Sequence, residues 1–174
     1  MPRPLAGLVA GIAATVPMTV AMELMFRGLP RRERYPLPPR RITDRLISVA
    51  GLEGEMDESR RREAALLSHF AYGAAAGAAY APIAERVRIG PLSAGVLYGL
   101  GVWTVSYLGW LPAAGILGPA TRHPARRNAL MIAAHVVWGA ATGYIAHRLD
   151  EDRGESGFAR RSDRPAAMPA GRGV

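Results

Sequence analysis

Four long stretches of this 174-residue chain contain no Asp, Glu or Arg, and the chain has no Lys at all. They are residues 5–22, 64–84, 89–121 and 128–147. A soluble helix rarely runs for about 20 residues without a charge, because one of its faces must meet water. An apolar stretch of about 20 residues is what the hydrocarbon core of a bilayer requires. This segregation of charges predicts a polytopic membrane protein, although the mean hydropathy of the whole chain is only +0.05.

The charge-free stretches predict an all-α fold with four transmembrane helices. We expect these helices at about 4–26, 64–84, 91–110 and 128–148. The first segment also resembles a signal peptide, but Pro17, Glu23 and a poor cleavage site favour a retained span. Pro112 is expected to end or kink the third helix, leaving AAGILG (113–118) at the membrane interface or re-entrant.

A polar loop, residues 27–63, separates the first two predicted spans. The prolines of PLPPR (36–40) predict an extended segment. Apolar residues then recur at helical spacing and predict a short amphipathic helix at about 42–50, lying on the membrane. Gly51 or Gly54 is expected to end this helix.

Other local signals complete the domain organisation, which we expect to be a transmembrane domain of residues 1–149 followed by a tail. Asp57 and Ser59 are plausible caps for the second predicted span. Residues 150–174 are charged and broken by Gly and Pro, which predicts a disordered tail. The chain has no Cys, so disulfides and thiolate-ligated metal sites are excluded.

Two segments of the chain are related to each other, which suggests an internal repeat. Residues 60–77 and 126–143 both carry an Arg pair followed by a His-x3-Gly-x3-Gly pattern. The Ala-Gly-x3-Gly pattern of residues 6–11 recurs at 94–99. These matches predict two related helical hairpins, and with two spans in each the halves share one membrane orientation.

Several short motifs carry a resemblance to a known family. GLVAG (7–11), Glu23, PLPPR (36–40) and AHVVWG (134–139) resemble the YagU-type family of small inner-membrane proteins of unknown function. The resemblance covers about residues 5–148 and implies a bacterial inner-membrane location and a helical hairpin architecture. It implies no established activity. The short loop between the third and fourth spans departs from the family pattern.

The distribution of arginine predicts a membrane orientation. The loops 27–63 and 118–127 together carry 13 Arg, against nine on the side of the two termini. Short loops count most in the positive-inside rule, and the second of these loops holds three Arg. We therefore expect both loops in the cytoplasm and both termini outside. The short basic runs are mixed with acidic residues, so no nucleic-acid partner is expected.

Each predicted span contains two glycines four residues apart. The pairs are Gly7/Gly11, Gly73/Gly77, Gly95/Gly99 and Gly139/Gly143. Glycines at this spacing lie on one helix face and let two backbones approach closely. We interpret them as helix-packing residues, the alternative being that the small face leaves room for a flat ligand.

Ionisable residues inside the predicted spans form the candidate site. His69 and His135 continue the glycine faces of their helices, and their distances from flanking arginines place them at similar depth. Glu23 lies in the same half of the bilayer, and Tyr107 reaches the same layer from the third span. An ionisable residue inside a bilayer is a hypothesis of a functional site by default.

This polar layer allows several interpretations. The side chains can simply hold the bundle together, with Glu23 paired to Arg27. They can also handle protons or a substrate, or two His and a carboxylate can hold a divalent metal or a haem. No cofactor is predicted, and no catalytic motif indicates an enzyme. The sequence favours a structural or interaction role in the lipid bilayer, as an accessory subunit of a larger membrane complex or as a homo-oligomer.

Overall fold

The computed structural model describes residues 2–52 and 54–162, which contain helices and connecting segments without a strand. The longer helices are α1 (Arg3–Arg27), α2 (Pro38–Val49), α3 (Glu58–Ala84), α4 (Pro91–Thr104) and α6 (Ala125–Ser162). The shorter ones are α5 (Leu111–Ala113), the 3-10 turns η1 (Arg31–Glu33) and η3 (Ala120–Arg122), and η2 (Val105–Trp110), which is a π-helix. The predicted all-α class is therefore confirmed.

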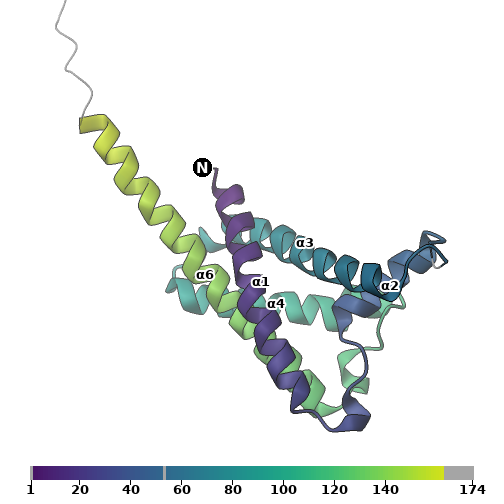
Figure 1. Cartoon of the computed structure of the whole chain (residues 1–174). Coiled ribbons are helices and arrows are strands. Elements are labelled where there is room, and N and C mark those ends of the chain that lie inside the picture. Colours follow the sequence, from purple (N-terminus) through teal and green to yellow (C-terminus); the bar gives the residue numbers. More distant parts are fainter. Residues whose placement is uncertain (1, 53, 163–174) are drawn as a thin grey trace, which may run out of the picture.

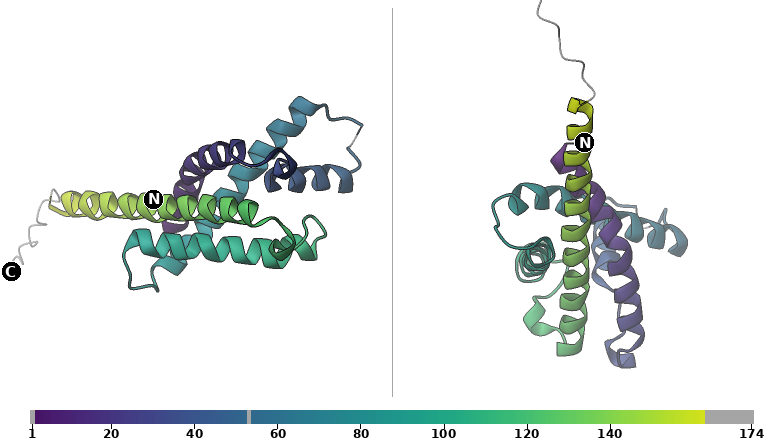
Figure 2. Two further views of the ribbon diagram at one scale, coloured as in Figure 1. Left: turned by 90° about the horizontal axis from the view of Figure 1, so that it is seen from below. Right: turned by 90° about the vertical axis from the view of Figure 1, so that its left-hand side faces the viewer.

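The bundle is built around an antiparallel pair of helices. Helices α1 and α6 lie side by side, and α3 and α4 cross them (Figures 1 and 2). Helix α3 packs on α1 and helix α4 packs on α6, whereas α3 and α4 make little contact with each other. The two flanking helices are thus held mainly by the central pair.

Close packing at these crossings depends on the eight paired glycines. A Cβ added at Gly7 would overlap the carbonyl of Gly77, and one added at Gly139 would overlap the carbonyl of Gly95. The other six glycines also face a neighbouring helix at close range. Only a residue without a Cβ allows backbones this close, so the glycines set the distance between the helices.

Gly143 differs from most of the paired glycines in what it contacts. A Cβ added there would overlap the backbone carbonyl of Pro91, at the start of α4, and would lie 3.0 Å from the Cα of Gly95. Gly143 and Gly7 also border a separate cavity of about 270 Å³ near the N-terminus of α1. Gly143 and Gly7 thus pack against the backbone of a neighbouring helix and also border open space.

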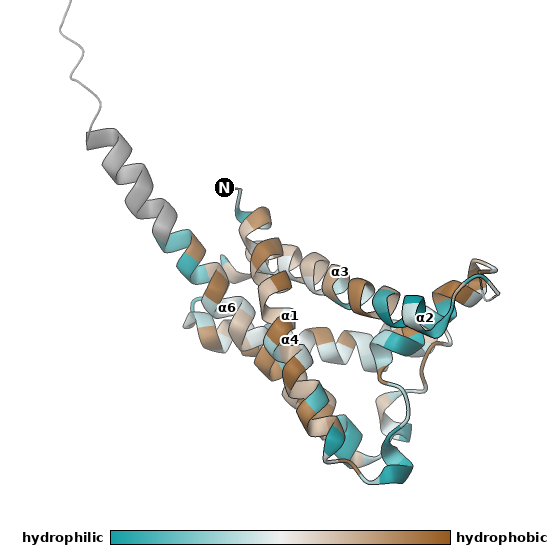
Figure 3. Cartoon of the chain, viewed as in Figure 1, coloured by the Kyte–Doolittle hydropathy of each residue, from teal (hydrophilic) through white to brown (hydrophobic). Residues whose placement is uncertain are grey.

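Three helical segments of the described chain are long and apolar enough to cross a membrane. They are Arg3–Arg27, Pro91–Ala113 and Ala125–Glu151. Helix α3 covers the remaining predicted span, 64–84, but its composition is less apolar, because Ala and Gly dominate it. Apolar residues predominate along α1, whereas hydrophilic residues are concentrated in α2 and the nearby turns (Figure 3).

Three sequence predictions about the polypeptide path need correction. Pro38 and Pro39 do not form an extended segment but begin α2, because residues of the first helical turn need no backbone N–H donor. Helix α2 consequently starts four residues before the predicted 42–50. Helix α6 continues to Ser162, so residues 150–162 are helical, not disordered. The remainder of the predicted tail, 163–174, lies outside the described residues.

The structure contains helix ends close to three of the predicted positions. The carboxylate of Asp57 accepts a hydrogen bond of 2.8 Å from the backbone N–H of Arg60 and caps α3. Gly51 follows the end of α2 with a φ of 72°, which favours glycine over other residues. Pro112 lies in the last turn of the third helical segment, which ends one residue later at Ala113, and the chain turns at Gly115, where φ is 65°.

Candidate ligand-binding cavity

A cavity of about 320 Å³ lies between α1, α2, α3, η2 and α6. Aliphatic, methionine and aromatic side chains form most of its wall, and no Asp, Glu or Arg is among the residues that line it. The polar side chains on the wall come from four of these helices: Thr15, Ser68, His69, Tyr72, Ser106, Tyr107 and His135. An apolar cavity with a few convergent polar groups is typical of a small-molecule site.

His135 is the most deeply buried ionisable residue of the predicted layer apart from Tyr107, with 6% of its surface exposed. Its Nδ1 lies 2.7 Å from the carbonyl oxygen of Met131, one turn earlier in α6. A carbonyl only accepts hydrogen bonds, so Nδ1 carries the hydrogen and donates it. In the neutral ring Nε2 is then an acceptor. Among the described residues, the ring makes its hydrogen bond through Nδ1 and none through Nε2.

The π-helix η2 forms the part of the wall next to Tyr72 of α3. A π-turn contains more residues than an α-turn, and such turns occur often at functional sites. This one brings Ser106, Tyr107 and Trp110 to the cavity. The hydroxyl of Ser106 accepts a hydrogen bond of 3.3 Å from the indole of Trp110 and is 2.9 Å from the hydroxyl of Tyr72 on α3. These bonds connect α3 to η2, in a region where the flanking helices α3 and α4 otherwise make little contact.

Tyr107 lies beside His135 and is 5% exposed. The two rings meet edge to face with centroids 6.1 Å apart, and Trp103 stacks on the tyrosine at 5.8 Å. The hydroxyl of Tyr107 is buried and has no hydrogen-bond partner in the described part of the chain. A buried polar group without a partner costs about 1–3 kcal/mol, so this hydroxyl is the most conspicuous unsatisfied group of the cavity wall.

His69 and Glu23 differ in their placement. His69 lies half-buried on α3 and lines the same cavity as His135 and Tyr107. Glu23 does not line that cavity; it forms an ion pair of 3.0 Å with Arg27 on the exposed surface of α1. The structure thus brings together three of the four predicted residues. Among the described residues, no group of three or more His, Asp or Glu is arranged to hold a metal ion.

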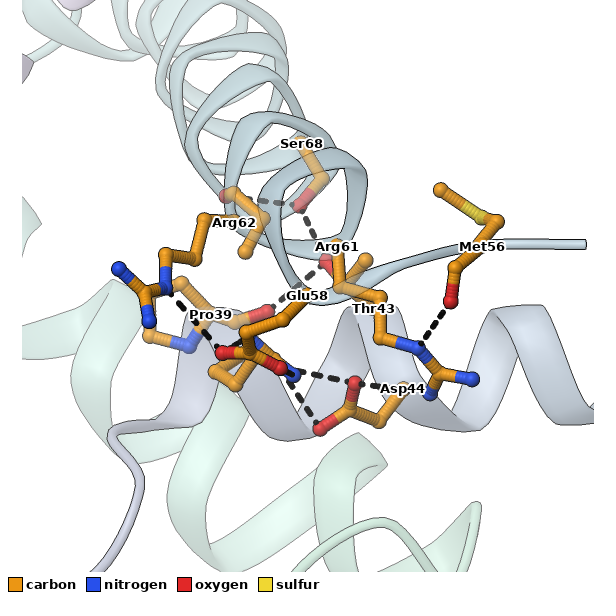
Figure 4. Close-up of polar contacts among 10 residues, drawn as sticks. Pro39, Thr43, Asp44, Met56, Glu58, Arg61, Arg62 and Ser68 are labelled. Atoms are coloured by element: carbon orange, nitrogen blue, oxygen red, sulfur yellow. Dashed lines mark hydrogen bonds and ion pairs between the residues drawn. The ribbon is translucent and has the colours of Figure 1, made fainter. Parts of the chain in front are cut away.

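Helix α2 closes one side of the cavity. Pro38, Pro39, Ile42 and Leu46 contribute to the wall. The opposite face of α2 is bound to the start of α3 by polar contacts (Figure 4). These contacts make α2 a wall element supported by α3.

The centre of these contacts is Arg40. Its guanidinium forms hydrogen bonds of 2.7 and 2.9 Å with the Glu58 carboxylate and also binds Asp44 one turn along α2. The hydrogen bonds from Arg40, and then that from Arg62, lower the pKa of Glu58 to about 2. The hydroxyls of Thr43 and Ser68 are 2.8 Å apart and add a neutral link between the helices.

Comparison with protein families places the chain in a known group. The model of the family described as "Protein of unknown function (DUF1440)" matches residues 12–143. The chain belongs to this family. The match includes every residue that lines the cavity, from Thr15 to Trp138. A search of the curated proteins and a search of the solved structures found no match.

In this DUF1440 chain a buried arginine, Arg127, joins the loop after α1 to the loop before α6. Arg127 is 6% exposed, and its guanidinium donates hydrogen bonds to the carbonyls of Glu33 and Tyr35 at 2.7 and 2.9 Å. It also lies 3.5 Å from the centroid of the Tyr35 ring, whose hydroxyl is 2.9 Å from Nδ1 of His123. The sequence identified Arg127 only as a charge at the end of a span. Its partners are more than 90 residues away, so no local signal indicates this role.

Ser106 and Tyr72 were also missed. Ser106 lies in an uncharged apolar run, and Tyr72 appears in the sequence only as an aromatic beside the glycine face of α3. Their contact depends on the π-turn, and no signal in the sequence identifies that turn at Val105.

Proposed function

We propose that this chain is an integral membrane protein with four spans, α3 being the fourth. Residues 64–84 of α3 contain no charge, and the helix packs along α1 through glycines as closely as α4 packs along α6. Leu66, Leu67 and Ile83 of α3 are exposed on the surface, with Leu67 72% exposed. A bilayer would cover such a surface without the cost that water imposes. The bilayer is then a principal partner of the protein.

We further propose that the four spans form two related hairpins, α1 with α3 and α4 with α6. Both hairpins close through glycines on both helices, which supports a common origin. The register between the two packed helices differs by one turn from one hairpin to the other. Gly77 packs on Gly7 and Gly11. Its counterpart Gly143 packs on Pro91 and Gly95, each one turn earlier in the related helix. A duplicated hairpin that has slid by one turn accounts for this difference.

The proposed location is the bacterial inner membrane, as the YagU-type resemblance of the motifs implies. The loops that Arg127 joins would be cytoplasmic and the termini outside. Reporter fusions at Gly28 and after Leu149 test the span count. Three spans between them, α3 included, would put the reporters on opposite sides, whereas reporters on one side would exclude α3 as a span.

We propose that the function of the protein is to bind a small, largely apolar molecule within the bundle. The observation that carries this proposal is the cavity of about 320 Å³, on whose wall Nε2 of His135 and the hydroxyl of Tyr107 lack partners among the described residues. Natural proteins rarely leave buried polar groups unpaired, so each such group asks for an explanation. A ligand that pairs with the buried Tyr107 hydroxyl would remove the cost of that group, and the same ligand would give Nε2 of His135 a partner.

Purification in native lipid tests this function. Small molecules that leave the membrane with the wild-type chain are identified by mass spectrometry, with metal and haem analysis of the same sample. An Ala71→Phe variant serves as the control, because Ala71 lines the cavity and a larger side chain there would fill it. A molecule that accompanies the wild type and is lost from the variant supports the proposal. The same molecules in equal amounts with both proteins would contradict it.

A structural or interaction role is the second proposal, with the chain as an accessory subunit or a homo-oligomer. A separate apolar groove between α3 and α4, lined by Ala76, Leu97, Gly101 and Val105 among others, supports it, because the two outer helices leave that groove open. Crosslinking in native membranes tests this role. A cysteine introduced at Leu97 should form a disulfide with its copy in a homo-oligomer, and a cysteine at Leu24 on the outside of α1 is the control.

A further inference from the structure

We infer that the cavity recognises its ligand by a hydroxyl group and that the rest of the ligand is uncharged and apolar. The inference rests on the proposed binding function, because it assigns a ligand chemistry to the same cavity. Three observations lead to it: the absence of charged side chains from the wall, the hydrogen-bonding roles of two unpaired groups, and the composition of the remaining surface.

The first observation concerns charge. No Asp, Glu or Arg is among the residues that line the cavity. Transfer of an ionised group from water into an apolar site is costly unless an opposite charge is present there. A carboxylate, phosphate or ammonium ligand would find no such partner on this wall. The ligand is therefore neutral.

The second observation concerns the hydrogen-bonding roles. Nε2 of His135 accepts, because Nδ1 of the same ring donates to the carbonyl of Met131. The hydroxyl of Tyr107 is a donor without a partner among the described residues. A ligand hydroxyl both donates and accepts, so one such group can satisfy the histidine and the tyrosine together. A carbonyl or ether only accepts, which leaves Nε2 unpaired, and a hydrocarbon satisfies neither residue.

The positions of the two residues agree with one shared partner. Their rings meet edge to face with centroids 6.1 Å apart, so both belong to one small region of the wall. The surrounding wall suits an apolar body, since Met18, Met22 and Met131 supply flexible thioether side chains and Trp110 supplies a flat aromatic face. Methionine adapts to irregular apolar shapes, which fits a chain or ring of lipid character.

Three brominated probes of equal chain length test the inference on the full chain in lipid nanodiscs: 10-bromodecan-1-ol, 1-bromodecane and 10-bromodecanoate. Bromine quenches nearby tryptophan fluorescence, and Trp110 and Trp138 both line the cavity. The control variants are Ala71→Phe, which fills the cavity, and Tyr107→Phe, which removes only an oxygen that makes no hydrogen bond in the described chain. Thermal melting of each variant checks that it is folded.

We expect the alcohol to quench at a lower mole fraction than the alkane or the carboxylate in the wild type. Tyr107→Phe should weaken binding of the alcohol by about twofold to tenfold, which is the change that one hydrogen bond produces. Binding of the alkane should be unchanged. Equal quenching by alcohol and alkane, or a preference for the carboxylate, would overturn the inference while the binding function stands. Quenching that Ala71→Phe never reduces, for any probe, would overturn the binding function itself.

Discussion

Replacement of Gly139 by Ala should destabilise the bundle, whereas the same change at Gly101 should not. A Cβ at Gly139 would overlap the backbone carbonyl of Gly95 and lie 3.0 Å from the Cα of Gly99, neither of which can move without the whole of α4. A Cβ at Gly101 has no atom within 4 Å, apart from its own helix. The two substitutions add the same methyl group to a helix and differ only in this contact.

The expected magnitudes follow from that contact. Ala is favoured over Gly in a helix interior by about 0.5–1 kcal/mol, which both variants gain. Overpacking a well-packed contact costs about 1–3 kcal/mol, which only Gly139→Ala incurs. We therefore expect a net loss of up to about 2 kcal/mol at Gly139 and a gain of about 0.5–1 kcal/mol at Gly101.

Thermal melting in mild detergent measures both variants beside the wild type. The sign of the effect is the decisive result, because it should be opposite at the two positions. Gly109→Ala provides a second open position, since a Cβ there also meets nothing within 4 Å. Equal shifts at Gly139 and Gly101 would refute the idea that glycine sets the distance between α4 and α6.

Two further predictions concern the polar contacts outside the spans. Arg127→Ala should lower the free energy of unfolding by about 1–3 kcal/mol, because loop carbonyls lose a charged donor, whereas Arg126→Ala on the exposed side should have little effect; thermal melts of both decide this. Protonation of Glu58 should release α2 from α3. Since the pKa of this carboxyl is lowered from 4.5 to about 2, its contribution is complete above pH 4.5 and is lost as the pH falls towards 2. Hydrogen exchange of α2 across that range should show the release in the wild type, little pH dependence with Glu58→Gln, and wild-type behaviour with Glu63→Gln.

The sequence by itself determined the helices and the glycine faces. Charges cannot be buried in lipid at low cost, so their absence from four stretches marked helices that the structure contains. Glycine at every fourth position puts bare backbone on one face, and all eight glycines lie at helix crossings. The contact of Gly143 with Pro91 could not be predicted in this way, because the sequence does not specify the register between two helices. The cap at Asp57 could be predicted, because a cap acts within one turn of its own helix.

The candidate site could be predicted only in part. Depth along each helix brought His69, His135 and Tyr107 to one level, and the structure places all three on one cavity. Depth alone does not specify direction around the bundle, and Glu23 at a similar level points to Arg27 on the outer surface. Glu23 therefore stays apart from the cavity of His135 and Tyr107, although it lines a neighbouring cavity together with His69.

Only the tertiary structure decided which groups have partners. Whether the hydroxyl of Tyr107 and Nε2 of His135 find partners in the described chain depends on how the π-turn η2 packs against α6. The role of Arg127 depends on a loop more than 90 residues away. Periodicity and composition describe one helix at a time. Hydrogen bonding between helices depends on their relative rotation and distance, which exist only once the glycine crossings have brought them together.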